Sequence, residues 1–423
     1  MTKDDIYRLI EEEDVEFIRL QFTDVLGNLK NMAVPPSQLN RVFAGEYSFQ
    51  GKTMFNYEEE LYLRPDPDTF CILPWRPQQG KVAKIFCDVY KENGEPLETS
   101  PRYILKKVLD EAKAKGYTFN VDPECEFFLY HTDENGLPTT TTHEVAGYMD
   151  VGPVDFGENA RRDIVLMMED MGFAVTASFH EGAPAQHEID FKGGDAFKTA
   201  DLIMTARFAV RSIAKRFGLY ATFMPKPRQG IAGSSLHLNI TAFKDGKNIF
   251  SSKEGEYSEE ALNFIGGILK HTPGLCAISN PTVNSYKRLL SGFDAPGTIS
   301  WAKRGDESAI KLFKRNGEAT VELRVPDASC NPYLTIALSI AAGIEGIEQK
   351  NDPGEDLNTR KDKPEALVKS INEAVKALSS DSLLTGILGK DFMEIYKDSK
   401  EKEWNEYIIQ VSDWEVAQYL IKM

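Results

Sequence analysis

Four stretches of the sequence place acidic, amide, imidazole or guanidinium side chains at every second position. In a β-strand, side chains two residues apart lie on the same face. Each stretch therefore predicts a strand with one apolar face and one face of potential metal ligands. The stretches and their polar-face residues are Pro123–Phe128 with Glu124 and Glu126; Ala185–Phe191 with Gln186, Glu188 and Asp190; Ser235–Ile240 with His237 and Asn239; and Thr320–Val325 with Glu322 and Arg324.

The pair Glu124 and Glu126 needs a physical explanation. Two carboxylates on one strand face repel each other unless a cation or a proton lies between them. A solvent-exposed strand face is the alternative, and it would need no ligand. Oxygen donors with a single imidazole, His237, suit Mg²⁺ or Mn²⁺ better than structural zinc. If the four polar faces converge, the sequence predicts a divalent-metal site.

The chain of 423 residues is longer than one compact core usually holds, so we expect two domains. Phe17–Thr23 and Lys81–Tyr90 read as strands, and the second ends at an Asn-Gly turn. We therefore expect a small β-rich domain over residues 1–99. Ser100 and Pro101 are residues typical of a helix start, so a larger domain is expected over 100–423.

Helices alternate with the strands in this larger domain, which makes its predicted class α+β. Glycines follow three of the predicted helices, as expected at helix ends. The segment Asn351–Lys363 is polar and contains Pro and Gly, so we expect an exposed loop there. The predicted helices are Pro101–Gly116, Glu158–Met171, Asp195–Phe217 and Thr335–Gly346, followed by amphipathic segments over 364–378 and 381–410.

Composition excludes several classes of partner. The formal net charge of −16, without a dense Lys/Arg run, argues against nucleic acid. No apolar run approaches the roughly 20 residues that a membrane span needs. Five dispersed cysteines, an odd number, indicate reduced thiols. Together with an acidic N-terminus unlike a signal peptide, they predict a cytoplasmic protein.

Longer segments resemble a known family. Asn280–Leu289, Pro326–Leu334 and Phe223–Pro227, together with the first two acidic strands, are similar to signature segments of type I glutamine synthetases. The similarity is collinear from roughly residue 10 to Trp414–Tyr419. The resemblance implies an N-terminal β-grasp domain over 1–99. It also implies a catalytic domain over 100–423 with an antiparallel sheet, a partial barrel backed by helices, and a C-terminal helical tail.

The resemblance also implies a reaction and an assembly. The expected enzyme is an ATP-dependent ligase that activates glutamate as γ-glutamyl phosphate and joins it to ammonia, giving glutamine. Two or three Mg²⁺ or Mn²⁺ ions per site are expected. The expected assembly is a homo-dodecamer of two stacked hexameric rings, with each site between one catalytic domain and a neighbour's β-grasp domain. The Trp414–Met423 tail resembles the family's inter-ring contact.

Site residues follow from the resemblance by motif position. One metal is expected on Glu126, Glu181 and Glu188, and a second on Glu124, His237 and Glu322. Glutamate is expected at Gly233, Arg288 and Arg324, the amine at Tyr148 and Gln50, and ATP at His237, Asn239, Arg304 and Lys311. The residues expected to take part in catalysis are Asp294, Arg288 and Glu181.

Several positions depart from the family pattern. Gln50 stands where the family has an Asp that attracts the ammonium ion, so a charge is lost. Asp294 replaces the flap Glu and is one methylene shorter, and reach matters in proton transfer. Asp306 replaces a phosphate-binding Arg and reverses the charge there. Lys311 and Thr320 replace two further arginines, and Ala232 replaces an amide that contacts glutamate.

These departures leave three hypotheses open. The first is a glutamate–ammonia ligase with an unusual pocket. The second is a γ-glutamyl ligase for an organic amine, such as a polyamine or alkylamine, or a ligase for a different acid; Gln50 favours it. The third is a catalytically weak regulatory homologue that binds metal and nucleotide, and Asp306 motivates it. Lys52, Lys303 or Arg304 could restore some of the lost positive charge.

Overall fold

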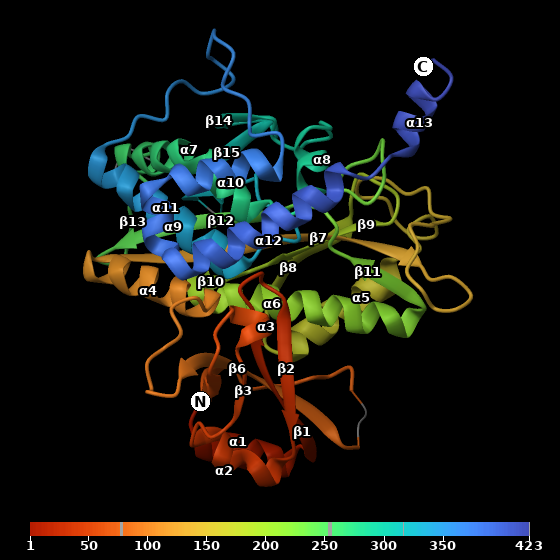
Figure 1. The fold of residues 1–423 in the computed structure, drawn as a ribbon, viewed down its shortest axis with the longest axis vertical. Helices are drawn as coiled ribbons and strands as arrows, with labels where there is room; N and C mark the ends of the chain where they lie inside the picture. Colours follow the sequence, from red (N-terminus) through yellow and green to blue (C-terminus); the bar gives the residue numbers. More distant parts are fainter. Residues whose placement is uncertain (77–78, 253–255, 316, 423) are drawn as a thin grey trace.

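The computed structural model of the protein describes residues 1–76, 79–252, 256–315 and 317–422. Figure 1 shows a small N-terminal domain beneath a larger domain in which helices cover an extended sheet. Met423, the last residue of the predicted tail, lies outside the described residues. The remainder of the tail includes α13 (Asp413–Tyr419), which projects from the body of the larger domain.

The N-terminal domain is built on a six-stranded sheet. Its order is β2-β1-β6-β4-β3, with β5 on β6, and only β1 and β6 run parallel. The two predicted strands are confirmed as β1 and β6. Three short helices that the sequence did not predict also belong to this domain. The elements are β1 (Val15–Thr23), β2 (Leu29–Val34), β3 (Ser48–Gln50), β4 (Glu60–Pro65), β5 (Cys71–Ile72), β6 (Lys81–Lys91), α1 (Lys3–Glu12), α2 (Leu39–Phe43) and α3 (Lys52–Phe55).

The larger domain contains a ten-stranded sheet with β7 near its centre. The main path is β14-β15-β16-β12-β7-β9-β8, and β10 and β11 also pair with β7. All four predicted polar-faced strands lie next to one another on this path. The expectation of an antiparallel sheet needs one correction, because β14 and β15 run parallel. The strands are β7 (Tyr117–His131), β8 (Val175–His180), β9 (Gln186–Phe191), β10 (Gly194–Asp195), β11 (Leu219–Thr222), β12 (Leu236–Lys244), β13 (Lys247–Asn248), β14 (Thr298–Ala302), β15 (Ser308–Arg315) and β16 (Glu318–Leu323).

The helices confirm most of the sequence prediction. Two segments differ: the one predicted over 364–378 is helical only from Ile371, and the one over 381–410 is split at Gly389, whose φ is +78°. The loop predicted at Asn351–Lys363 contains no helix or strand. The helices are α4 (Pro101–Ala114), α5 (Glu158–Asp170), α6 (Ala196–Ala214), α7 (Glu259–Ser279), α8 (Ser285–Leu289), α9 (Pro332–Gln349), α10 (Ile371–Ser380), α11 (Ser382–Leu388) and α12 (Lys390–Ile408).

Helices α7 and α9 cross at a point where only glycine fits. A Cβ added at Gly267 would lie 2.1 Å from the carbonyl oxygen of Ala342, and one at Gly346 would lie 2.2 Å from that of Asn263. The missing side chains let the two backbones touch, which gives a tightly packed layer behind the sheet. This layer is rigid support for the polar face on the other side.

A buried arginine joins the two domains. Arg102, at the start of α4, is 3% exposed and binds Asp66 and Asp88 of the N-terminal domain and Asp201 of α6. Tyr333 of α9 donates a further hydrogen bond to Asp201, with 2.6 Å between the oxygens. Three carboxylates on one guanidinium fix α4 and α6 against the small sheet. Within the described residues, no helix is both long and apolar enough to span a membrane.

Candidate metal centre

The polar faces of four strands meet at one place on the large sheet. Glu124 of β7 is directly opposite His237 of β12 on one side and Asp190 of β9 on the other. One step along, Glu126 lies opposite Glu188. These antiparallel registers bring together the carboxylates that the sequence predicted on separate strands, because the alternation of each strand holds its polar side chains on the same face of the sheet.

Glu124, His237 and Glu322 form the first acidic group. One potential ligand atom from each lies within 4.8 Å of the others. His237 Nδ1 is 3.2 Å from Glu124 Oε2 and 3.6 Å from Glu322 Oε1. Burial would raise the pKa of Glu124, but hydrogen bonds from His237 and Asn239 lower it to about 2. The carboxylate is therefore ionised and ready to bind a cation.

Glu181, Glu188, Asp190 and Glu126 form the second acidic group. Burial and the neighbouring carboxylate of Glu126 raise the pKa of both Glu181 and Glu188. Burial also raises the pKa of Asp190, to about 6, and Glu188 shares a hydrogen bond with it. Like charges at this density are unfavourable without a compensating cation.

Glu126 is held in place by uncharged donors. Gln186 Nε2 and the Ser235 backbone N–H donate to its Oε2 at 2.8 and 3.0 Å, and the Ser235 hydroxyl donates to its Oε1. These bonds fix the carboxylate without neutralising it. The two acidic groups thus offer oxygen-rich donors with one imidazole, a set that fits hard divalent cations such as Mg²⁺ or Mn²⁺.

Two arginines stand at the edge of the first acidic group. Arg324 binds Glu322, and Arg315 Nη1 lies 3.5 Å from Glu124 Oε1. Sequence reasoning named Arg324 and missed Arg315. Arg315 comes seven residues before Glu322, and its strand neighbour across β15–β16 is Glu318. Its approach to Glu124 of β7 is a long-range contact that sequence spacing does not predict. The alternation of β9 places Asp190 on the polar face, but no motif marks it as a site residue.

Arg288 supports the backbone beside the site. It is 2% exposed, and its guanidinium donates to the carbonyl oxygens of Val325 and Arg324, both at 2.9 Å. Gly233 packs against it: a Cβ there would lie 2.2 Å from the Pro225 carbonyl oxygen and 3.2 Å from Arg288 Cγ. Close packing at this position therefore requires glycine.

Asp294 is brought to the second acidic group by a tight turn. Phe293 and Asp294 have φ of +58° and +64°, values that are unusual for residues other than glycine. Asp294 lines a cavity of about 40 Å³ together with Glu126, Glu181 and other residues. The remaining lining residues are Gln186, Ala232, Gly233, Ser235, His237, Arg288, Phe293 and Ala295.

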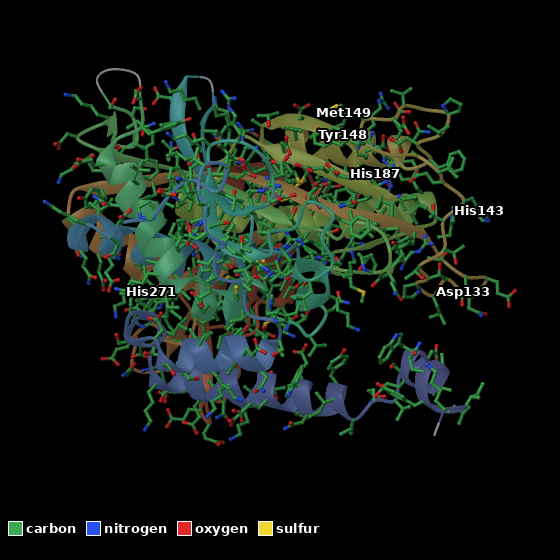
Figure 2. The ribbon with its side chains drawn as sticks, turned by 90° about the horizontal axis from the view of Figure 1, so that it is seen from above. Asp133, His143, Tyr148, Met149, His187 and His271 are labelled. Carbon is green, nitrogen blue, oxygen red and sulfur yellow. The ribbon has the colours of Figure 1, made fainter. Side chains whose placement is uncertain are left out.

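Tyr148 lies on a loop beside these carboxylates. Its ring makes an edge contact with Phe179, and Met149 N–H donates to the His180 carbonyl oxygen. Figure 2 shows Tyr148 and Met149 on the same side of the domain as His187, far from His271. The side chain of Tyr148 is 60% exposed, and partial burial together with Glu181 raises its pKa.

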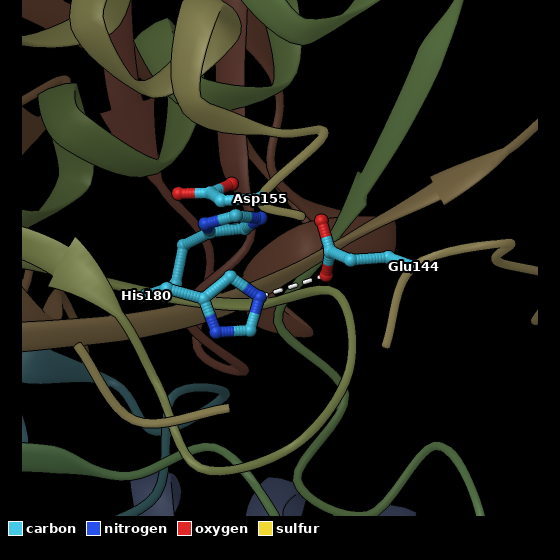
Figure 3. A group of neighbouring side chains, drawn as sticks. Glu144, Asp155 and His180 are labelled. Carbon is cyan, nitrogen blue, oxygen red and sulfur yellow. Dashed lines mark hydrogen bonds and ion pairs between the residues drawn. The ribbon is translucent and has the colours of Figure 1, made fainter. Parts of the chain in front are cut away.

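The Tyr148 loop is fastened by a buried ion pair. His180 Nε2 lies 2.7 Å from Glu144 Oε1 (Figure 3), and His180 Nδ1 lies 2.7 Å from the Glu181 carbonyl oxygen. Glu144, His180, Asp155 and His187 form a separate cluster of potential metal ligands, distinct from the two acidic groups. Arg161 already binds Asp155 and lies 2.7 Å from His187 Nδ1, so a cation would meet a guanidinium there. This group fits a positioning role better than a metal.

Several predicted residues lie away from the metal centre. Gln50 is on β3 of the small domain, where its Nε2 lies 3.4 Å from Glu60 Oε1. Lys52 pairs with Glu58. Lys303 Nζ lies over the Tyr257 ring, and Arg304 is on an exposed loop. Of the proposed substitutes for lost positive charge, none contacts the two acidic groups within the described residues.

Two more of the altered positions are close to the acidic face. Lys311 of β15 is opposite Glu322 and pairs with Asp306. Thr320 is two residues before Glu322 on β16, and its Oγ1 is 3.5 Å from that of Thr241. Asn239 donates to Glu124 Oε1 at 2.8 Å. The candidate metal ligands therefore lie together. Of the family's arginines near them, the resemblance indicates that Asp306, Lys311 and Thr320 replace three.

Comparison with known proteins covers the whole chain. The family model described as the glutamine synthetase β-grasp domain matches residues 14–92, and that of the glutamine synthetase catalytic domain matches residues 98–419. The glutamine synthetase of Clostridium saccharobutylicum is 47% identical, with 100% of this chain and 99% of the relative covered. That of Methanosarcina mazei is 44% identical, with 99% and 98% covered.

Solved structures show the same architecture. A complex of GmaS with ADP superimposes with a TM-score of 0.89 and 31% identity, covering 98% of this chain and 99% of that one. The glutamine synthetase of Plasmodium falciparum gives a TM-score of 0.88, with 99% of both chains covered. Its identity of 24% makes this second likeness a statement about the fold alone.

Proposed function

The chain belongs to the glutamine synthetase family, and on that premise we propose that it joins glutamate to ammonia in an ATP-dependent reaction that gives glutamine. The observation that carries the proposal is the convergence of Glu124, His237 and Glu322 with a second carboxylate group on one sheet face. Identities of 43–47% to glutamine synthetases over nearly the full length support the same activity.

We assign one metal to Glu126, Glu181 and Glu188, and a second to Glu124, His237 and Glu322. Bound divalent ions would neutralise the charge of the ATP phosphates. The close carboxylates support this assignment, since their mutual repulsion is relieved when a cation binds. Asp190 also belongs to the second acidic group. We assign it as a hydrogen-bonding neighbour of Glu188 and not as a metal ligand.

The first chemical step joins two anions. A γ-carboxylate oxygen of glutamate attacks the γ-phosphorus of ATP, and ADP leaves, which gives γ-glutamyl phosphate. Arg324 is proposed to bind the substrate anion with its forked guanidinium. Arg288 and Gly233 shape the pocket, because Arg288 holds the carbonyl oxygens of Val325 and Arg324 and Gly233 permits close packing.

The second step releases phosphate. Ammonia attacks the acyl carbon, the carbon–oxygen bond to phosphate breaks, and a proton must leave the nitrogen. Asp294 is proposed as the base, since it lines the cavity that also contains Glu126 and Glu181. Tyr148 is proposed to line the amine pocket, and Glu181 to share in attracting the ammonium ion.

ATP is proposed to lie on the side of the first acidic group. His237, Asn239, Lys311 and Arg304 are the residues we assign to it by motif position. A structural neighbour with a TM-score of 0.89 is a complex with ADP, which supports a nucleotide in this fold. Arg315, which contacts Glu124, is an additional cation within reach of a bound phosphate.

We propose a cytoplasmic dodecamer of two stacked hexameric rings. In it, a neighbour's β-grasp domain would supply Gln50 to each site, which accounts for the distance between Gln50 and the metal centre of its own chain. The tail supports ring stacking: α13 and the residues after it expose Trp414, Leu420 and Ile421, at 62%, 76% and 93%. A free monomer rarely leaves such apolar side chains uncovered.

An organic amine in place of ammonia is a second candidate. Gln50 keeps the hydrogen-bonding capacity of the family's aspartate but loses its charge, and Asp294 is shorter than the family's glutamate. The lost charge at Gln50 weakens the capture of a small cation, and the shorter side chain of Asp294 leaves more room. The amine pocket could therefore admit an alkylamine or a polyamine.

Phosphate release distinguishes the candidates. Purified protein with glutamate, ATP and Mg²⁺ or Mn²⁺ is assayed against ammonia and a panel of alkylamines and polyamines. We expect ammonia to support turnover. If kcat/KM is at least tenfold higher for an organic amine than for ammonia, that amine is the substrate. Silence with every amine, and with other acids in place of glutamate, would favour the regulatory homologue instead.

A further inference from the structure

Asp306 binds two cationic side chains near the metal centre, Lys311 and Arg324. Its Oδ1 lies 3.0 Å from Lys311 Nζ and 3.5 Å from Arg324 Nη1. Arg324 Nε also donates to the Asp306 backbone carbonyl at 3.2 Å. The carboxylate therefore stands where an anionic ligand of Lys311 and Arg324 would place its own oxygens.

The two sides of this contact differ in freedom. The Arg324 side chain is 8% exposed and is held from behind by Glu322. The Asp306 side chain is 52% exposed, on the exposed segment 303–307 that connects β14 to β15. The Arg324 guanidinium is therefore fixed, and the Asp306 carboxylate is the partner that can move away. Water competes for the exposed carboxylate and weakens its ion pairs, so an incoming anion can displace the aspartate.

We propose that Asp306 is an internal competitor that occupies the Arg324–Lys311 anion position until a substrate carboxylate or phosphate displaces it. The residue then sets the apparent affinity of the site for anionic ligands and takes no part in bond making. The identity of those anions, glutamate and the nucleotide, rests on the proposed function. In a contrary role, the Asp306 carboxylate would bind a cationic amine. Its removal would then weaken amine binding and leave the affinity for anions unchanged.

Calorimetric binding tests the competition directly. Glutamate and ADP, each with Mn²⁺, are titrated into wild-type protein and into Asp306→Asn and Asp306→Ala. We expect Kd for at least one anion to fall about threefold to tenfold in both variants, since a pair of this exposure contributes little more. The gain should shrink at high ionic strength. Glu307→Gln, the adjacent exposed carboxylate, is the matched control and should leave Kd unchanged.

The contrary results are equally clear. Unchanged or weaker binding of both anions in the Asp306 variants would overturn the proposal. So would an increase in KM for the amine with no change for either anion, because that result makes Asp306 an amine contact. Thermal melting confirms that each variant is folded, as expected for an exposed residue. Because binding is read without turnover, an inactive wild-type protein would contradict the proposed function while leaving this test decisive.

Discussion

Glu124 lies directly across the β7–β12 pair from His237, and the Glu124 Oε2 to His237 Nδ1 distance is 3.2 Å. Glu322 reaches the same imidazole from the next strand, at 3.6 Å. Three strands therefore supply one ligand each. A slip of one residue in either pairing would turn a ligand to the opposite face, so the register of the sheet determines whether the centre exists.

Removal of one ligand from the first acidic group should weaken metal binding. We expect Glu322→Gln to reduce Mn²⁺ affinity at least tenfold, because a charged oxygen donor is replaced by a neutral amide. Titration followed by electron paramagnetic resonance measures the change. Glu318→Gln, on the exposed end of the same strand, is the control. Equal affinity in Glu322→Gln and wild-type protein would remove Glu322 from the ligand set.

Charge repulsion in the second acidic group should limit the stability of the metal-free protein. Glu188→Gln removes one of four crowded carboxylates, so we expect it to raise the melting temperature in the presence of a chelator. In wild-type protein, metal at 100 times its Kd should add about 2.7 kcal/mol. The variant should gain less from added metal. Destabilisation of the chelated variant would show that repulsion is not the dominant interaction at Glu188.

The interdomain arginine should be essential for stability. Arg102→Met leaves the buried Asp201 carboxylate without its cation, which we expect to cost about 3–5 kcal/mol. Arg102→Lys should lose less, since one charge remains but the forked geometry is lost. Arg8→Met, at an exposed pair with Asp5, is the control and should change stability by under about 0.5 kcal/mol. Urea unfolding at fixed protein concentration measures all three.

His271 should make stability depend on pH. Burial would lower its pKa, but hydrogen bonds to Asp381 and Glu345, at 2.6 and 2.7 Å, raise it above the ordinary value. Against the effect of burial, the hydrogen bond from His271 lowers the pKa of Asp381, and hydrogen bonds from Lys270 and His271 lower that of Glu345. The stabilisation is therefore fully present below about pH 6.5 and is lost as pH rises through the folded-state pKa. It also fades in acid, when the carboxylates are protonated.

The corresponding experiment compares unfolding free energies across pH. We expect His271→Gln to cost about 1–3 kcal/mol near pH 6 and less at pH 9. His143→Gln is the control, because the His143 ring contacts His131 rather than a carboxylate. A cost for His271→Gln that is constant from pH 6 to 9 would mean that the imidazole acts by packing alone.

The polar faces of the strands were predictable because alternation is a local property. Glu124 and Glu126 must share a face in any strand, and the resemblance placed them on different metals. Their encounter with His237 and Glu188 depends on strand order, which periodicity does not contain. The parallel β14–β15 pair and the approach of Arg315 to Glu124 arise from the same long-range pairing.

Helices with unusual composition escaped prediction. Helix α7 contains Pro273 and three glycines, residues that normally disrupt helices, yet it is buried against α9. Tertiary packing outweighs local propensity there. Helix α1 begins with an acidic turn, and its capping box uses Asp5 rather than the more usual Glu or Gln. Gly389 interrupts a continuous amphipathic pattern, so the predicted single segment is two helices.

Transfer of oxygen from glutamate to phosphate tests the central claim most directly. With glutamate labelled by ¹⁸O in its γ-carboxylate, plus ATP, Mg²⁺ and ammonia, mass spectrometry of the released phosphate reports the path of the oxygen. Attack of the carboxylate on ATP followed by cleavage of the acyl carbon–oxygen bond predicts one labelled oxygen in each phosphate. Phosphate without label, or release that does not require glutamate, would contradict activation of glutamate at this centre.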